Sequence, residues 1–412
     1  MRISTSQMFN VSTSGMSSQQ AEMARLQQQM AAGKRILTAA DDPVAASAAM
    51  VEQQSITQID QYQRNIDSAS HRINLAESTL SQIGDVAQSA RTLLVNAGDA
   101  VLSASDRASI ATQLSEHLKT MLALANSQDG NGRFLFSGYQ DATAPYSQTP
   151  TGATYVGDSG QPVLQVGSRR YIETSNAGAQ IFEAAPTGNG TFATTISDPA
   201  ASPAVTNGGT GLIDNGKVLN AAGYTGQTYI IKFNAGGSTY DVIQRTGGVE
   251  TTLSSGNAYG SGNAIQLAGG AIETSISGAP VSGDRFVVAP SSTQNMFTTL
   301  QSAINALNSW TPGALPSTVY TDAMRLAQTN LDQATDTVLT VRTSIGARLS
   351  ELDTLKSSND GVKIQHTQRM SDLQDLDYAQ AASDLTHDQL AMQAAQQSFV
   401  RISNLSLFNF LG

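Results

Sequence analysis

Four histidines are the first candidates for acid–base or metal chemistry in this 412-residue chain: His71, His117, His366 and His387. None belongs to an H-E-x-x-H motif. None has a second imidazole four residues away, the spacing that places two metal ligands on one helical face. All four fall within helical patterns, so each is interpreted as a solvated helix residue. The histidines therefore predict neither a catalytic site nor a metal site.

Carboxylates and glycines offer two further candidates. Asp372, Asp375 and Asp377 lie within about one helical turn, but aspartates ahead of a helix more often complement its positive end than bind a metal. The Gly130-Asn131-Gly132 run is not followed by the helix of a dinucleotide-binding loop. The patterns G-K-[ST] and G-x-S-x-G do not occur. We predict that the chain is not an enzyme and needs no cofactor.

Composition narrows the class of protein. A net charge of −10 and a pI near 4.8 disfavour nucleic-acid binding, which needs a clustered basic surface. Cysteine is absent, so neither disulfides nor thiolate metal sites are expected. The sequence has no window of eighteen apolar residues, and its first residues lack the apolar segment of a secretory signal. We expect no membrane insertion, and export, if it occurs, without a cleaved signal peptide.

Both ends of the chain carry apolar residues at strict seven-residue intervals. Seven residues are two turns at 3.5 per turn, so each stripe stays on one helical face only if the helices supercoil. Ser12, Gln19 and Asp388 occupy the alternate positions, which makes each stripe narrow. We expect these helices to be weakly ordered alone and to pair with each other and with neighbouring subunits. The stripes are Phe9, Met16, Met23, Met30 and Leu37, and then Tyr378, Leu385, Met392 and Phe399.

The last residues complete the predicted assembly interface. Ile402 extends the C-terminal stripe by three residues. The segment beyond it is strongly apolar, and we expect it to be buried only when the next subunit arrives. Its apolar residues are Leu405, Leu407, Phe408, Phe410 and Leu411.

Between the ends, two heptad patterns predict long bundle helices. The first should begin at Pro43, where Asp42 supplies a capping oxygen, and run to about Asn96. A shorter helix should end near Ser127, and helical periodicity returns at Thr293. Asn359-Asp360-Gly361 is expected to weaken or kink the last long helix. Its heptad phase then slips before Tyr378, which predicts a boundary between the bundle and the terminal helix.

The middle of the chain has a different composition, with most of the 35 glycines and 11 prolines between residues 141 and 290. Such density forbids long helices, and short alternating runs predict an all-β domain. Arg133–Gly138 is predicted to be a strand, Asn234–Gly237 a hairpin turn, and Pro186–Asn215 a loop. The other predicted strands are Pro162–Val166, Arg170–Thr174, Tyr229–Phe233, Thr239–Ile243, Ala264–Leu267 and Arg285–Ala289.

The resulting architecture is nested, an α+β multidomain chain with a coiled coil and a helical bundle built from both chain ends. We predict a terminal coiled-coil domain from residues 1–40 and 375–412. A bundle with a short β-hairpin is expected from residues 41–140 and 291–374, and an all-β insertion domain from residues 141–290. The elbow between the first two domains is assigned to Lys34, Arg35, Asp41, Asp42 and Pro43.

Several motifs, taken together, resemble the bacterial flagellin family, and most closely its hook–filament junction branch, the hook-associated protein 3 proteins. They cover roughly residues 1–140 and 290–412, with Gly283–Val288 as a weaker match. These motifs are MRISTSQMF at residues 1–9, GKRILTAADDPVAA at 33–46, FLFSG at 134–138, DLDYA at 375–379 and LSLFNFL at 405–411.

This resemblance implies a structural protein exported through the flagellar type III apparatus and assembled outside the cell in the flagellum. Its implied partners are further copies in a ring or helical layer, the first hook-associated junction protein, flagellin, and a cytoplasmic export chaperone on the C-terminal helix. It also implies a terminal coiled coil on the channel side and an outward β domain. Two alternatives stay open: a filament flagellin, and an adhesin-like projection carried by the β domain.

Overall fold

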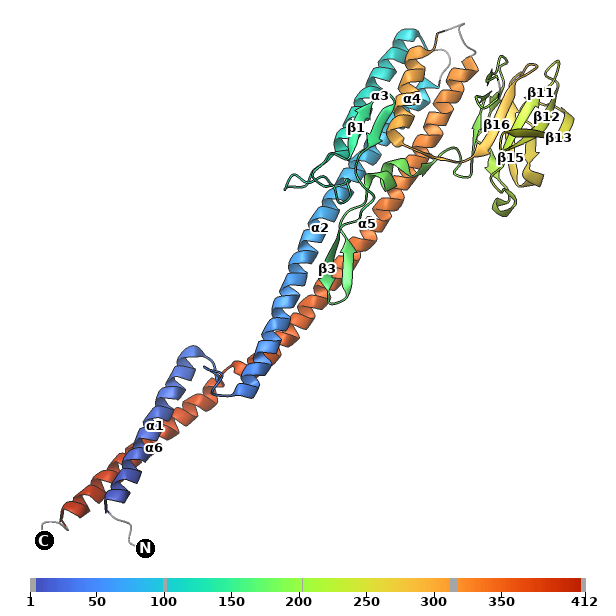
Figure 1. The fold of residues 1–412 in the computed structure, drawn as a ribbon. Coiled ribbons are helices and arrows are strands. Elements are labelled where there is room, and N and C mark those ends of the chain that lie inside the picture. The colour runs from blue at the N-terminus through green and yellow to red at the C-terminus, as the bar shows by residue number, and fades with distance from the viewer. Residues whose placement is uncertain (1–4, 99–101, 202, 312–316, 409–412) are drawn as a thin grey trace. The chain divides into compact units, whose positions relative to one another are not determined.

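A computed structural model describes residues 5–98, 102–201, 203–311 and 317–408 (Figure 1). The chain forms two compact units, the first from residues 1–64 and 354–412 and the second from residues 65–353. Two long helices, α2 (Pro43–Ala97) and α5 (Ser317–Gln374), contribute to both units. Terminal helices, a central antiparallel β region and the predicted α+β class are confirmed.

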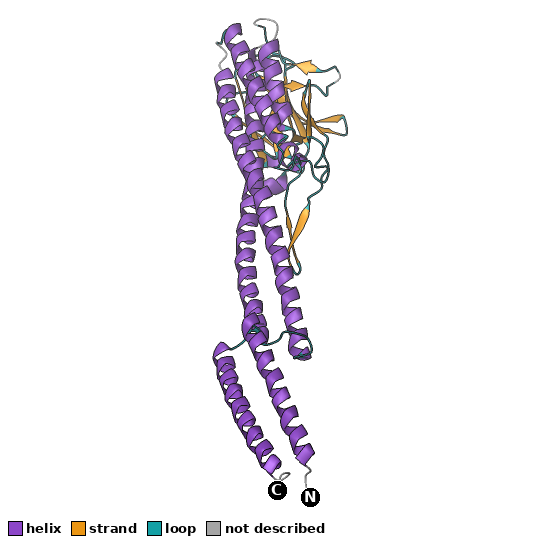
Figure 2. Ribbon diagram, turned by 90° about the vertical axis from the view of Figure 1, so that its left-hand side faces the viewer, coloured by secondary structure: helices purple, strands orange, loops and turns teal. Residues whose placement is uncertain are grey.

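The first unit contains α1 (Thr5–Ala32) and α6 (Tyr378–Phe408), which lie side by side and run antiparallel (Figures 1 and 2). α2 begins at Pro43, as its capping aspartate predicts. α5 runs unbroken through Asn359–Gly361, so the predicted kink is wrong. Gly361 is exposed there and creates no gap in packing. Side-chain contacts on either side, Gln63 to Asp360 at 2.7 Å and Lys363 to Asp60 at 2.6 Å, hold this part of α5 against α2.

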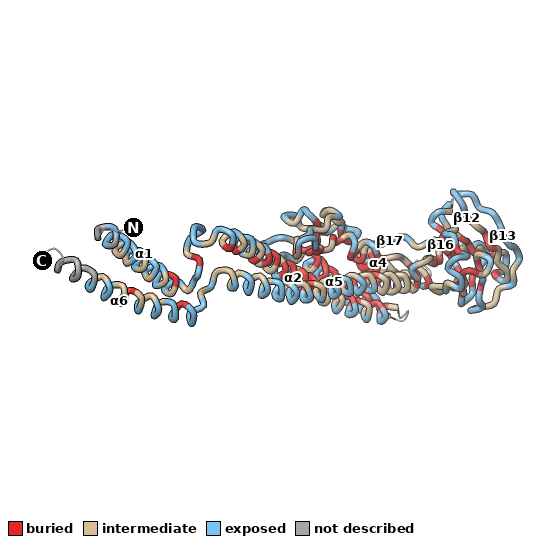
Figure 3. The backbone as a smooth tube through the Cα atoms, turned by 90° about the horizontal axis from the view of Figure 1, so that it is seen from below, coloured by how far each residue is buried: buried red, intermediate tan, exposed pale blue. Residues whose placement is uncertain are grey.

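The second unit contains a helical bundle of α2, α5, α3 (Ala104–Ala125) and α4 (Met296–Ser309). Ser103 and Asp106 form a capping box at the start of α3, and the Asn295 side chain caps α4. Figure 3 shows buried residues along α2, α4 and α5, where the heptad positions predict them. The fully buried heptad residues include Ile66, Ile73, Leu80 and Leu94 on α2 and Met324 and Leu331 on α5.

Two short hairpins and a five-residue π-helix, Ala179–Glu183, belong to this unit. The predicted strand Arg133–Gly138 is wrong, because only Phe134 makes a β-bridge, to Gln128. Its carbonyls bond instead to scattered amides, such as Phe136 O to Gly178 N at 2.7 Å, so the segment is buried as irregular chain. The hairpin strands are β1 (Tyr146–Thr149), β2 (Gly152–Tyr155), β3 (Val163–Gly167) and β4 (Arg170–Glu173).

A β-sandwich follows, entered and left through one antiparallel pair, β5 (Ala185–Pro186) and β17 (Thr293–Gln294). One sheet has the order β13-β12-β11-β16-β6, and the other joins β10, β15 and β14, with β9 beside β15. Phe233, Phe286 and Ile272 are fully buried in the core of this sandwich. The strand bounds are β6 (Phe192–Thr195), β7 (Ser197–Asp198), β8 (Val205–Thr206), β9 (Leu212–Ile213), β10 (Lys217–Val218), β11 (Thr228–Phe233), β12 (Thr239–Thr246), β13 (Val249–Ala258), β14 (Ala264–Leu267), β15 (Ile272–Ser277) and β16 (Arg285–Pro290).

The sandwich confirms the predicted hairpin at Asn234–Gly237, which joins β11 to β12 with Gly236 and Gly237 at positive φ. The prediction of a loop at Pro186–Asn215 is wrong. β6 lies there and pairs with β16 through Phe192 and Pro290, and the Phe192 side chain is fully buried. The partner strand is about a hundred residues away, so no local pattern could indicate the pairing.

One polar cluster stabilises the sandwich, and an arginine of α5 joins it to the bundle. Asp198, with a side chain only 1% exposed, accepts two hydrogen bonds from Arg245, at 2.8 and 2.6 Å, and one from Arg285 at 2.9 Å. Glu250 accepts from both guanidiniums on the more exposed side. Burial alone would raise the pKa of Asp198, but the two arginines hold it below its ordinary value. On α5, Arg325 donates to the Thr194 carbonyl of β6 at 2.9 Å and joins helix to sandwich.

Candidate assembly interface

The elbow of the first unit is held by main-chain hydrogen bonds. Gly33 follows α1 with φ +68°, the left-handed conformation that ends many helices. Lys34 and Asp375 form one antiparallel bridge, flanked by Arg35 N to Gln374 O at 2.7 Å and by Leu376 N to Gly33 O at 3.1 Å. The predicted elbow is therefore a point where the chain leaving α1 pairs with the chain leaving α5.

Arg35 connects three elements at this point. Its Nη2 donates to the Leu373 carbonyl at 2.8 Å, which satisfies a carbonyl at the C-terminus of α5. Its Nη1 lies 3.4 Å from Asp42 Oδ2, and its own carbonyl accepts from buried Gln29 Nε2 at 2.5 Å. Gln29 was not among the predicted site residues, because a glutamine beside an apolar stripe carries no signal for burial.

Asp41 and Asp42 shape the turn into α2. Asp41 Oδ2 accepts from the amides of Leu37 and Thr38 at 3.0 and 2.8 Å, and Asp42 Oδ1 accepts from Ala45 N at 3.0 Å. The Thr38 amide is the largest influence that lowers the pKa of Asp41, and the Ala45 amide has the same role for Asp42. Asp42 therefore caps α2, and Asp41 holds the turn that precedes it, each in its ionised form.

Asp377 performs the same function for α6. Its Oδ1 accepts from Ala379 N at 2.9 Å and from Gln380 N at 3.1 Å, so the capping interpretation of this aspartate is confirmed. Tyr378, predicted as an apolar seam residue, also donates its hydroxyl to the Met30 carbonyl at 3.1 Å. A Cβ added to Gly33 would lie 3.1 Å from that hydroxyl, so glycine also provides room for the tyrosine.

The seam between α1 and α6 uses the predicted stripes. The rings of Phe9 and Phe399 lie 5.0 Å apart, and Met30 meets Tyr378 at the other end of the same register. Both intervals are twenty-one residues, so Met16 falls level with Met392 and Met23 with Leu385. Met392 is only 5% exposed, while the three α1 methionines are half-buried.

Not every predicted interface residue lies in this seam. Leu37 was predicted to continue the α1 stripe, but this is wrong, because the helix ends at Ala32 and Leu37 belongs to the elbow turn. Ile402, Leu405, Leu407 and Phe408 belong to α6, and Phe410 and Leu411 lie outside the described residues.

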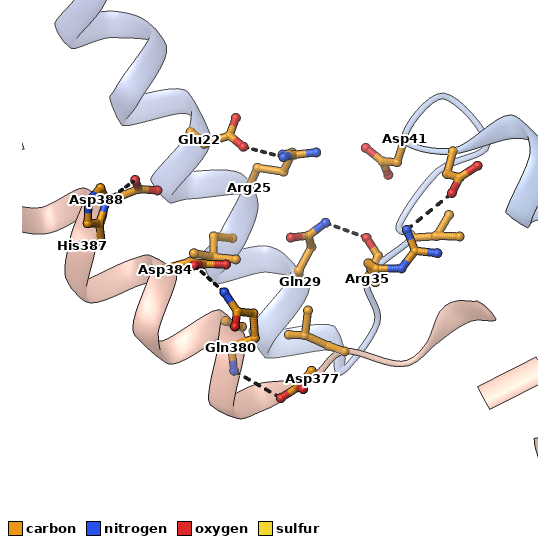
Figure 4. Close-up of a pocket in the computed structure, with 15 residues that line it drawn as sticks. Glu22, Arg25, Gln29, Arg35, Asp41, Asp377, Gln380, Asp384, His387 and Asp388 are labelled. Atoms are coloured by element: carbon orange, nitrogen blue, oxygen red, sulfur yellow. Dashed lines mark hydrogen bonds and ion pairs between the residues drawn. The ribbon is translucent and has the colours of Figure 1, made fainter. Parts of the chain in front are cut away.

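A cavity of about 510 Å³ opens beside the elbow, between α1, α6 and the turn into α2 (Figure 4). Its lining is mostly charged, and the two arginines in it already pair with acids, Arg25 with Glu22 and Arg35 with Asp42. Asp384 accepts from Gln380 Nε2 at 2.9 Å. The recess is therefore hydrophilic and acidic, unlike the apolar seam next to it.

The histidine interpretation is wrong for one residue. His366 is 20% exposed, and its Nδ1 lies 2.5 Å from Glu52 Oε2, in a contact between α5 and α2 within the first unit. His387, in contrast, is 81% exposed beside the elbow cavity. Among the described residues, no three histidines or carboxylates converge as metal ligands. No helix in the same part of the chain is long and apolar enough to cross a membrane.

The model of the bacterial flagellin N-terminal helical region matches residues 3–141. Flagellar hook-associated protein 3 of Escherichia coli K12 is 30% identical over 411 residues, and that of Salmonella typhimurium 29% over 409 residues, each covering 99% of both chains. FlgL of Xanthomonas campestris, a crystal structure, is 29% identical with a TM-score of 0.69, covering 78% of this chain and 99% of that one.

A second crystal structure, flagellar hook-associated protein 3 (HAP-3) from Legionella pneumophila, is 27% identical with a TM-score of 0.70, covering 79% of this chain and 98% of that one. The sequence relatives match over nearly their full length, so the similarity includes the terminal helices and the elbow as well as the bundle. The chain therefore belongs to the flagellar hook-associated protein 3 family, whose members are structural proteins of the bacterial flagellum.

Proposed function

We propose that this chain is the subunit of the junction layer between the flagellar hook and the flagellin filament, and that it assembles through α1 and α6. One solved relative is described as a flagellar junction protein. The proposed role is mechanical and non-catalytic. It requires no cofactor, and its work is done by surfaces that become buried between subunits.

The observation that carries this proposal is the apolar surface that α1 and α6 leave exposed in the single chain. Phe9 is 51% exposed, Tyr378 54%, Leu390 67% and Val400 54%. A large apolar side chain contributes about 1.5–3 kcal/mol when it becomes fully buried. Neighbouring copies in a ring or helical layer would cover this surface, and the terminal residues Phe410 and Leu411 are assigned to the same interface.

The further partners follow from the same surface. The first hook-associated junction protein and flagellin would contact the layer from its two sides. Before export, a cytoplasmic chaperone would cover the apolar residues of α6, which would otherwise favour aggregation. The protein would leave the cell through the flagellar type III apparatus and reach its extracellular position in the flagellum.

The experiment is complementation of a strain that lacks the protein. Such a strain should build hooks but release its flagellin into the medium, and the full chain should restore filaments. Removing residues 400–412 should abolish this rescue. Hooks that still retain filaments in the absence of the protein would refute the proposal.

A sandwich deletion provides the matched control. The main chain closes at the neck, where Thr187 N donates to Ser292 O at 2.8 Å and Pro186 pairs with Thr293. Replacing residues 188–291 by an Asn-Gly turn should therefore leave the bundle intact and retain the rescue. The opposite pattern, with α6 dispensable and the sandwich essential, would favour the adhesin-like alternative. Immunogold labelling along the filament, instead of at its base, would favour a filament flagellin.

A further inference from the structure

Four methionines form the centre of the α1–α6 seam. They are Met16, Met23 and Met30 on α1 and Met392 on α6. The chain contains no cysteine, so its 11 methionines are its only sulfur-containing side chains. The seam therefore gathers the chain's softest, most readily oxidised groups at the contact on which pairing of its two ends depends.

We propose that this methionine seam is a site of reversible oxidative modification that controls the pairing of α1 with α6. Two-electron oxidants such as hydrogen peroxide would transfer one oxygen atom to each thioether sulfur. The sulfur loses two electrons and becomes a sulfoxide, and the peroxide is reduced to water. The effect on subunit assembly rests on the proposed function, but the modification and the loss of pairing do not.

The methionines differ in their exposure to solvent, and this difference determines which of them an oxidant modifies first. Met16, Met23 and Met30 are half-buried and Met392 is 5% exposed, so three of the four seam methionines are partly open to solvent in the folded chain. The three bundle methionines, Met121, Met296 and Met324, are fully buried in the second unit. Met50, on the outer face of α2, is 74% exposed. The described methionines thus span three accessibility classes, and the half-buried class comprises Met16, Met23 and Met30 in the seam and Met370 on α5.

The consequence follows from the composition of the seam. A sulfoxide places a strongly polar oxygen where the thioether made apolar contacts, and a buried polar group without a hydrogen-bond partner is unfavourable. Ser12, Gln19 and Asp388 occupy alternate positions beside the stripes, so the seam is narrow and few other apolar contacts can compensate. Once Met16 and Met23 are oxidised, Phe9 against Phe399 is the main apolar contact left at the far end of the pair.

The test uses the full-length monomer treated with hydrogen peroxide, with peptide mass spectrometry to locate sulfoxides and amide exchange to follow α1 and α6. Met50 should be oxidised first without effect. Oxidation of the seam should then accelerate exchange in both helices by about tenfold or more. Met121, Met296 and Met324 should stay unmodified. Methionine sulfoxide reductases should restore the original exchange.

Two variants serve as controls. The variant Met16→Leu, Met23→Leu, Met30→Leu, Met392→Leu keeps volume and apolarity, so it should show no acceleration of exchange after the same treatment. Met50→Leu should behave like the parent. Seam methionines that oxidise no faster than Met121, or seam oxidation without faster exchange, would overturn the inference. Either result would leave the complementation test, and hence the proposed function, unaffected.

Discussion

Replacing Gly33 by alanine should unpair α1 from α6 even though it adds only one methyl group. Gly33 has φ +68°, and the left-handed conformation costs a residue with a Cβ about 1–2 kcal/mol. The new Cβ would lie 3.1 Å from the Tyr378 hydroxyl, which then has to move away from the Met30 carbonyl. Losing that hydrogen bond adds about 0.5–1.5 kcal/mol. We expect a total of about 2 kcal/mol, or roughly a 30-fold change in the opening equilibrium.

The matched control is the same substitution inside α1, the helix that Gly33 ends. Gly15 lies inside α1, and a Cβ there would meet no atom within 4 Å. Gly15→Ala should therefore stabilise α1 by about 0.5–1 kcal/mol, because glycine in a helix interior loses more conformational entropy than alanine. Amide exchange of α1 and α6 in the full chain should become faster in Gly33→Ala and slower in Gly15→Ala.

The two substitutions are expected to change amide exchange in opposite directions, which distinguishes a local effect at Gly33 from a general effect of an added methyl group. An unspecific influence of extra apolar surface would shift both variants in the same direction. Unchanged exchange in Gly33→Ala would refute the assignment of Gly33 as the residue that lets α1 end against Tyr378. Exchange in the α2–α5 bundle should be the same in both variants, since neither glycine belongs to it.

Three further predictions concern the sandwich and the elbow. Asp198→Asn should lower the free energy of unfolding of the sandwich by about 3–5 kcal/mol, and Glu250→Gln should lower it by less because Glu250 is more exposed. Urea unfolding followed by amide exchange of β11 and β12 measures both values, and equal values would contradict this prediction. Asp42→Ala should fray the first turn of α2, whereas Asp42→Asn should keep it, as NMR shifts of the first helical amides can test. The pKa values of Asp41 and Asp42 lie below 3.8, so the hydrogen bonds that their carboxylates accept stabilise the elbow above about pH 3.8. This stabilisation is lost as pH falls through the lowered pKa values; an acid transition centred above pH 5 would be incompatible with this.

The helices could be predicted from sequence because their heptad pattern is a direct record of packing. Ile66, Ile73 and Leu80 are at most 1% exposed, at the positions where their spacing requires a partner helix. The same holds for the boundary before Tyr378, where the phase slip marks the break between α5 and α6. Periodicity fails only where a single residue overrides it, as Gly33 does when it ends α1 four residues before Leu37.

Strands were predictable where an apolar run lies between turn residues, whether its partner strand is near or remote in sequence. Tyr229–Phe233 is an apolar run, buried at four of its five positions, and it pairs with the next strand through a glycine turn, so the pattern sufficed. β13, Val249–Ala258, is exposed along almost its whole length and has no apolar alternation, and hydrogen bonds to β12 define it instead. Phe192 is isolated among small residues, and its burial depends on a partner strand remote in sequence.

The candidate interface divides in the same way. The stripe residues Met16, Met23 and Met392 were predicted because spacing alone places them on one face. The elbow contacts were not predicted, because they involve main-chain carbonyls: Arg35 donates to the Leu373 carbonyl, and the Arg35 carbonyl accepts from Gln29. Every residue has a main-chain carbonyl, so residue types do not indicate which carbonyl accepts a hydrogen bond. Such contacts can be identified only in the folded chain.

The nested arrangement of α1 and α6 also sets an order in time. The Tyr378 hydroxyl and the Met30 carbonyl are 348 residues apart in sequence, among the longest separations that the fold closes. α1 is the first helix made and waits without its partner until almost the entire chain has followed. The bundle and sandwich can fold in that interval, because their contacts need only residues 65–353. The first unit is thus completed last. The apolar stripe of α1 stays exposed, and prone to aggregation, until α6 pairs with it.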